Sequence, residues 1–246
     1  MEKEKEGMIG TLKTKNLFRE YPKAVRHNKS LFPNNYLDFV ELDNREEIES
    51  TVEQFLTKLN DKSIKNEIDV LKFINKDTRA FYLIGSIFNY YDFGHHDAYV
   101  FPEFQLSEMY KVDYLLIGKN SDGYSFIFVE LEHPVKDITL KSGELGNAFR
   151  KGINQLKDWQ TLLITNFAGV TNTLKKYKHP DVQLPDEFYT LDPTRFHYTV
   201  VAGRRDDLAD KTRKIRREHQ IQQGIKLLHY DNICDNTLAL LNQRNY

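Results

Sequence analysis

Two neighbouring apolar segments joined by a short turn constrain the fold of this chain more than any other feature. "VDYLLIG" at 112–118 and "YSFIFVELE" at 124–132 are rich in the β-branched and aromatic residues that favour strands. The residues from Asn120 to Gly123 between them are of the types that form turns. The pattern predicts a β-hairpin, and the continuously apolar run at 126–129 is typical of a strand covered on both faces.

The segments around this hairpin predict an α/β or α+β fold, because strands and helices follow one another along the chain. Before it, three segments with apolar residues at helical spacing predict a mainly helical N-terminal region, residues 1–97; they lie at 43–60, 63–76 and 77–91. After it, the pattern predicts one domain at 98–246. Its expected elements are an extended segment at 98–106, the hairpin, a helix at about 145–165, and a strand, helix, strand and helix at 196–204, 206–220, 224–231 and 232–243.

Composition narrows the setting in which the chain works. Cys234 is the only cysteine, so no disulfide can form within the chain, and we expect a reducing, cytoplasmic location. The charged start "MEKEKEGMIG" does not predict a signal peptide, and no run of about 18 apolar residues predicts a membrane span. Since the formal net charge is −1, binding to nucleic acid would need a local basic surface.

Three carboxylates lie at the ends of the two predicted hairpin strands. Glu130 and Glu132 are two residues apart, so their side chains point to the same face of a strand. Asp113 begins the partner strand, where pairing would place it beside Glu130. Burying such charges without a partner is costly, and a divalent cation such as Mg²⁺ or Mn²⁺, which prefers carboxylate oxygens, would relieve the cost. The alternative is that the two glutamates lie on the solvated face of a half-exposed sheet.

These residues resemble the core of the PD-(D/E)XK nuclease superfamily, which has an acid on one strand, two functional positions on the next, and then a helix. More closely, the chain resembles the nuclease domain of the Shedu antiphage defence family. The resemblance covers roughly 100–232, through "FPEFQL", "VDYLLIG", "FIFVELEHP", "AFRKGINQLKDW", "YTVVAGRR" and "GIKLLHYDNI". It implies a restriction-endonuclease-like mixed sheet flanked by helices, Mg²⁺- or Mn²⁺-dependent cleavage of DNA in bacterial defence against phage, and a homo-oligomer.

The resemblance also implies roles for individual residues. Asp113 and Glu130 match the two metal-binding acids, and Gln155, four residues before Trp159, matches a helix glutamine that reaches toward the site. Glu132 stands where the superfamily most often has the lysine assigned to positioning the attacking water. A glutamate can bind metal or accept a proton, but it cannot donate a positive charge. Three interpretations are open: Glu132 is an extra metal ligand, the core is inactive, or another lysine takes the role. The candidates for that lysine are Lys136, Lys141 and Lys151.

Other residues extend the prediction beyond the three acids. Glu103, in "FPEFQL", is a candidate further metal ligand or, alternatively, a surface residue of an edge strand. A basic cluster in "GRRDDLADKTRKIRREHQ" predicts contacts with DNA phosphates, and its members are Arg204, Arg205, Arg213, Lys214 and Arg217. Acidic residues are interleaved with this cluster, so a solvated and partly self-neutralised helix is the alternative. The alternative for the helix pair is that Trp159 is a core residue and Gln155 a surface residue.

Two other classes of function stay open. A degenerate nuclease core that binds DNA, or a phage or partner protein, without cleavage is favoured by the glutamate at position 132. A structural or interaction protein with no nucleic-acid role is favoured by the near-neutral charge. Metal-dependent cleavage would distinguish a nuclease from a module that only binds. Salt-dependent retention of DNA would distinguish that binding module from a protein with no nucleic-acid role.

Overall fold

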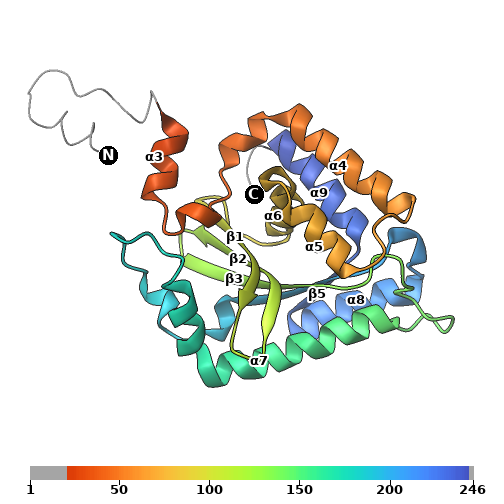
Figure 1. Cartoon of the computed structure of the whole chain (residues 1–246). Coiled ribbons are helices and arrows are strands. Elements are labelled where there is room, and N and C mark those ends of the chain that lie inside the picture. The colour runs from red at the N-terminus through yellow and green to blue at the C-terminus, as the bar shows by residue number, and fades with distance from the viewer. Residues whose placement is uncertain (1–20, 244–246) are drawn as a thin grey trace, which may run out of the picture.

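A five-stranded mixed sheet forms the centre of the protein (Figure 1). The structure is a computed structural model that describes residues 21–243. The charged segment at 1–10, which does not predict a signal peptide, lies outside the described residues. The strand order is β1-β2-β3-β4-β5, with antiparallel pairs from β1 to β3 and parallel pairs from β3 to β5. The strand bounds are β1 Asp97–Gln105, β2 Lys111–Asn120, β3 Gly123–Leu131, β4 Phe196–Val201 and β5 Ile225–Leu228.

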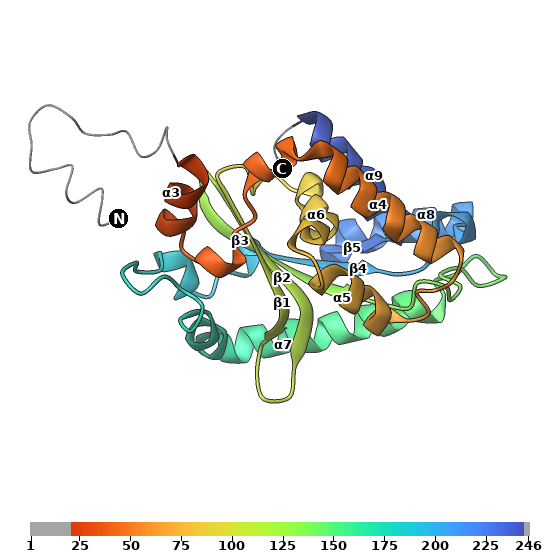
Figure 2. The same cartoon turned by 45° about the horizontal axis from the view of Figure 1, so that its top comes forward.

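Helices cover both faces of the sheet. Figures 1 and 2 show α7 and α8 on one side of the sheet and α4, α5, α6 and α9 on the other. The helix bounds are α3 Pro22–Lys29, α4 Arg45–Asn60, α5 Glu67–Asn75, α6 Phe81–Gly85, α7 Asn147–Leu174, α8 Asp210–Gln223 and α9 Tyr230–Gln243. This arrangement confirms the predicted α+β class, with a mixed sheet flanked by helices and a helical N-terminal part.

The apolar run of β3 is unbroken because its side chains point alternately to the two faces of the sheet and both faces are covered. Phe126 and Phe128 belong to the core beneath α7, whereas Ile127, Val129 and Leu131 belong to the core on the opposite face. Since both faces are covered, every position from Phe126 to Val129 is apolar, until the chain reaches its acidic end. The hairpin and the doubly covered strand were both predicted from the sequence, and both are confirmed.

The N-terminal helices pack directly onto the rest of the chain. One apolar cluster joins Val52 and Phe55 of α4 to Val129 of β3 and Tyr230 of α9, and the rings of Phe55 and Tyr230 meet edge to face with centroids 6.2 Å apart. α4, before the sheet in the chain, and α9, after it, therefore share one hydrophobic core. The domain boundary at residues 97 and 98 stays a prediction.

Several local predictions differ from the structure. The helix expected to end near residue 165 continues as α7 to Leu174, but Asn166 leaves helical geometry with φ −144° and ψ 43°, so the predicted end coincides with a kink. The helix expected over 77–91 is broken into α6 between two 3₁₀ turns. α3 was not predicted. Among residues 21–243, no helix combines the length and apolar character that a membrane span requires.

Candidate functional site

The register of the hairpin brings Asp113 beside Glu130. The antiparallel pairing of β2 and β3 ends at Tyr114 and Val129, so Asp113 and Glu130 are the next residues along the two strands. Beyond this point a side chain links the two strands: Asp113 Oδ2 accepts a hydrogen bond from the Leu131 amide at 2.7 Å. The approach of these two acids was predicted from the sequence, whereas their chemical roles stay predictions.

Glu130 and Glu132 are buried, which excludes the interpretation that they lie on a solvated face. Glu130 is 5% exposed and Glu132 is 2% exposed. The β4 strand covers them at the side, since Glu130 is in register with Val200 and the Glu132 amide donates to the Val201 carbonyl at 2.8 Å. Glu130 Oε2 and Glu132 Oε1 are buried without a hydrogen-bond partner. Such orphaned buried oxygens are uncommon and call for a ligand, a proton or a functional reason.

Lys151 of α7 supplies the positive charge nearest these acids. Its Nζ contacts Glu132 Oε2 at 3.0 Å, while the lysine side chain stays 61% exposed. The approach of α7 depends on Gly152, because a Cβ at that position would lie 2.5 Å from Val200 Cγ1 and 3.3 Å from Glu132 Cγ. Of the other lysines considered, Lys136 acts electrostatically on Glu132, and Lys141 is exposed with no contact to the acids.

Gln155 and Trp159 continue the inner face of α7. Gln155 is half-buried and follows Lys151 by four residues, so the two side chains share one side of the helix. Trp159 is fully buried in the core beneath the sheet, as the alternative for this residue predicts. The helix thus presents the Lys151 cation to Glu132 and is anchored in the core through the Trp159 indole, and a role for Gln155 stays a prediction.

Glu67, rather than Glu103, is the fourth acid that acts on this group. In the β1–β2 register, the residue pairs before and after it place Glu103 opposite Asp113. The backbone of Glu103 has a φ of 49°, and its exposed carboxylate forms an ion pair with Lys111. Glu67, at the start of α5, acts electrostatically on Asp113, Glu130 and Glu132. Nothing in the local sequence around Glu67 distinguished it. A ligand role for Glu103 stays a prediction.

Burial and mutual repulsion raise the pKa values of the three strand-end acids. Burial, opposed by the Leu131 amide and reinforced by the charge of Glu132, raises the pKa of Asp113 to about 6. Burial and the charges of Asp113 and Glu132 raise the pKa of Glu130 to about 10. Burial also raises the pKa of Glu132, although the hydrogen bond from Lys151 opposes this. Raised carboxyl pKa values in one cluster are typical of functional sites.

These pKa values predict how stability depends on pH in the absence of metal. Unfolded Glu130 ionises near pH 4.5, but the folded protein holds the proton to about pH 10. Its contribution is therefore fully present below pH 4.5 and decreases as the pH rises toward 10, by at most about 1.4 kcal/mol per pH unit. We expect the free energy of unfolding in EDTA to fall between pH 6.5 and 8, and this fall to become much smaller in Glu130→Gln.

Urea denaturation at pH 6.5, 7, 7.5 and 8 measures this effect. His197, His229 and Lys226 have lowered pKa values and act in the opposite direction, but they are present in both proteins, so the difference in slope between the wild-type protein and Glu130→Gln isolates the contribution of Glu130. Equal slopes for the wild-type protein and Glu130→Gln would show that Glu130 ionises as freely in the folded chain as in the unfolded chain.

The acids have the chemistry of a cation site but are not gathered around one point. Within the described residues, no three His, Cys, Asp or Glu side chains are arranged to hold a metal ion. The donor set itself is suitable, because Asp113, Glu130 and Glu132 offer carboxylate oxygens, two of them buried and unpartnered, and such oxygens are the preferred ligands of Mg²⁺ and Mn²⁺.

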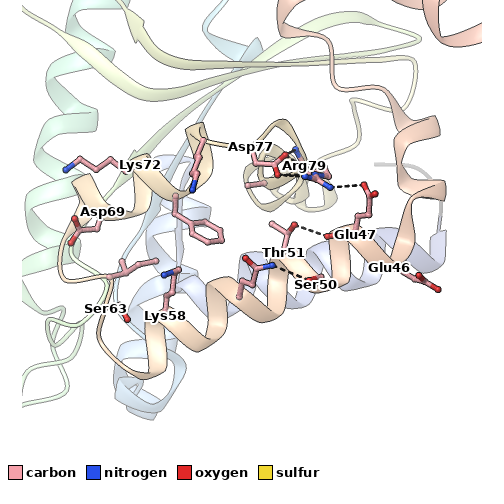
Figure 3. A pocket seen from close by; sticks show the side chains of 15 residues that line it. Glu46, Glu47, Ser50, Thr51, Lys58, Ser63, Asp69, Lys72, Asp77 and Arg79 are labelled. Carbon is pink, nitrogen blue, oxygen red and sulfur yellow. Dashed lines mark hydrogen bonds and ion pairs between the residues drawn. The ribbon is translucent and has the colours of Figure 1, made fainter.

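A sizeable cavity lies away from these acids. It has a volume of about 740 Å³ and is formed by α4, α5 and the turn before α6. Figure 3 shows its polar lining, in which Arg79 binds both Glu47, at 2.9 Å, and Asp77, at 2.7 Å. Its lining carries charges of both signs, so the cavity gives no sign of a particular ligand.

The predicted basic cluster divides into two groups. Arg204 and Arg205 are engaged in ion pairs with α9, since Arg204 contacts Asp231 at 2.7 Å and Arg205 pairs with Asp235. Arg213, Lys214 and Arg217 are exposed on α8, where Arg213 lies 3.9 Å from Asp210 and Lys214 lies 3.7 Å from Glu218. The α8 group is thus the one available to an external partner, and its binding to DNA stays a prediction.

Comparison with known proteins agrees with the resemblance seen in the sequence. A search of curated proteins finds no match to the chain. A family model described as the C-terminal part of the Shedu protein SduA matches residues 49–233. The match covers most of the 246 residues and includes α5, the acidic strand ends, α7 and α8. The chain therefore belongs to the Shedu family, and this membership suggests a role in antiphage defence.

Proposed function

We propose that this protein is a metal-dependent DNA endonuclease that hydrolyses phosphodiester bonds of phage or other foreign DNA. The observation that carries the proposal is the group of three acids at the ends of β2 and β3, two of them buried, with a lysine from α7 against it. Gathering carboxylates in this way costs stability unless a partner or a proton offsets their charge, so such a group is typical of a functional site. Membership of the Shedu family supports a setting in antiphage defence, and we propose a cytoplasmic homo-oligomer that acts on DNA.

Asp113 and Glu130 are the residues proposed to hold Mg²⁺ or Mn²⁺, with Glu132 as a further ligand or acceptor. The chemistry that such a cation supplies when bound is a lowered pKa for a coordinated water and neutralisation of phosphate charge. Glu130 is buried and Asp113 is half-buried, so bulk water has limited access to their oxygens. Their raised pKa values mean that a cation has to displace protons, so its affinity should rise with pH.

Lys151 is proposed to act in place of the lysine that the superfamily carries at the position of Glu132. Glu132 Oε2 holds the Lys151 ammonium at 3.0 Å, so the glutamate fixes a cation instead of supplying one. The exposed part of the lysine can reach a phosphate that approaches from solvent, and a cation there stabilises charge that develops in the transition state. Gln155, one helical turn further along α7, is proposed to orient the attacking water or a phosphate oxygen.

The direct test is cleavage of linear and circular DNA by the purified full-length chain. We expect fragments with Mg²⁺ or Mn²⁺, none in EDTA, and recovery of cleavage when the metal is restored in excess. Circular dichroism of each sample shows whether the chain is folded. Undiminished cleavage in EDTA would contradict the metal site.

The second candidate is a nuclease-like module that binds DNA or a partner protein without cutting. The specific observation in its favour is that, across residues 21–243, the acids are not arranged to hold a metal ion. It predicts that folded protein retains DNA in a salt-dependent way, with and without EDTA, and cuts no form of DNA with any divalent metal. The same set of assays therefore separates the two candidates.

A further inference from the structure

A second pocket, lined by cations, opens at the free edge of the sheet. It has a volume of about 270 Å³ and lies between α8, the edge strand β5 and the start of α9. No carboxylate lines it. Its lining consists of Tyr90, Arg213, Arg216, Arg217, Gln220, Lys226, Leu227, Leu228 and Asn232.

Arg216 forms the wall of this basic pocket. Its Nε donates to the Leu227 carbonyl at 2.7 Å, and so satisfies a backbone acceptor of the edge strand. That bond uses one of the five donors of the guanidinium. Within the described residues, Arg216 and its neighbour Arg217 form no ion pair with a carboxylate. Arg216 is thus held in place by the backbone while most of its hydrogen-bonding capacity is left for something else.

Lys226 forms the floor of the basic pocket and is only 7% exposed. Its Nζ donates to the Tyr90 carbonyl at 3.1 Å and lies 4.5 Å and 4.8 Å from the ring centres of Tyr90 and Tyr91. Burial lowers the pKa of Lys226 to about 8 and that of Arg216 to about 10. A buried lysine without a carboxylate partner is costly, and the rings offset only part of that cost.

The acids around the basic pocket are directed to cations other than Arg216, Arg217 and Lys226. Asp231 and Asp235 of α9 bind Arg204 and Arg205. On α8, Asp210 lies 3.9 Å from Arg213, and Glu218 lies 3.7 Å from Lys214. The positive charges of Arg216, Arg217 and Lys226 therefore converge on one small space without an internal counter-ion.

We infer that the basic pocket binds a phosphate group. Arginine forks match the tetrahedral oxygens of phosphate, and Gln220 and Asn232 at the rim offer amide donors for the remaining oxygens. The site is separate from the carboxylates at the ends of β2 and β3, and the inference holds whether or not those acids cut DNA. The phosphate could belong to a nucleic-acid backbone or to a free nucleotide, since both present the same group.

Titration of the full-length chain with inorganic phosphate, against potassium chloride at equal ionic strength, tests the inference. We expect saturable binding to the wild-type protein and about tenfold or greater weakening in Arg217→Gln and in the double variant Arg213→Gln/Arg217→Gln. Lys211→Gln removes a charge from the same helix without touching the pocket, since Lys211 pairs with Glu144, and should leave phosphate affinity unchanged. Arg217 is preferred to Arg216 as a test because it makes no bond to the edge strand.

Two outcomes would overturn the inference: phosphate that binds no better than chloride, or the same phosphate affinity in the double variant as in Lys211→Gln. The source of the phosphate follows from competition. If phosphate competes with a DNA oligonucleotide and Arg217→Gln weakens binding of that DNA, the pocket takes backbone phosphates. If a mononucleotide binds and DNA affinity is unchanged in Arg217→Gln, it takes a free nucleotide. Both results support a phosphate site.

Discussion

Glu130→Gln is expected to reduce metal-dependent DNA cleavage by about 100-fold or more while the chain remains folded. The substitution keeps the size of the side chain but removes the charge that a divalent cation needs. In EDTA at pH 8 the variant should be at least as stable as the wild-type protein, because burial and the charges of Asp113 and Glu132 already resist ionisation of Glu130. Loss of activity with unchanged or increased stability is typical of a residue kept for function.

Cleavage rates at saturating Mg²⁺, together with urea midpoints in EDTA, measure both parts of this result. Glu108→Gln is the matched control, because Glu108 is an exposed glutamate in the loop between β1 and β2. It should leave both quantities unchanged. Cleavage by Glu130→Gln at the wild-type rate would remove Glu130 from the metal site, and a large loss of stability would mean that its carboxylate is structural.

Lys151→Met is expected to lower the cleavage rate by about 10²- to 10³-fold, the range found when one electrostatic donor to a transition state is removed. Methionine retains much of the length of the side chain but lacks the ammonium that contacts Glu132 at 3.0 Å. Lys151 is mostly exposed, so its loss should affect stability little. Glu132 can respond by taking up a proton, since burial has already raised its pKa.

Single-turnover cleavage separates Lys151 from the other candidate lysines. Lys141→Met is the control, since Lys141 is exposed and does not contact the acids. Lys151→Arg should recover part of the rate because the charge is kept. If Lys151 acts on the phosphate and Glu132 only holds it, Glu132→Gln should lose less activity than Lys151→Met. Equal rates for Lys151→Met and Lys141→Met would exclude Lys151 from the reaction.

Much of the fold could be predicted because its signals are local. The hairpin follows from two apolar segments and a turn, and the burial of β3 on both faces follows from its unbroken apolar run. The elements that differed depend on context. Asn166 interrupts α7 inside a segment whose helical pattern continues, and the segment at 77–91 is bent where it packs between α9 and the sheet. A periodic pattern gives the type of an element more reliably than its continuity.

The sequence by itself determined which acids lie at the strand ends, because strand periodicity and hairpin register place Asp113, Glu130 and Glu132 together whatever surrounds them. Only the tertiary structure decided which other charges join them. Lys151 reaches Glu132 because Gly152 lets α7 lie close to β4, and Glu67 arrives from a helix that precedes the sheet in the chain. These charges lie on separate elements of the chain and become neighbours only on folding, so the spacing of residues along the chain could not predict their approach.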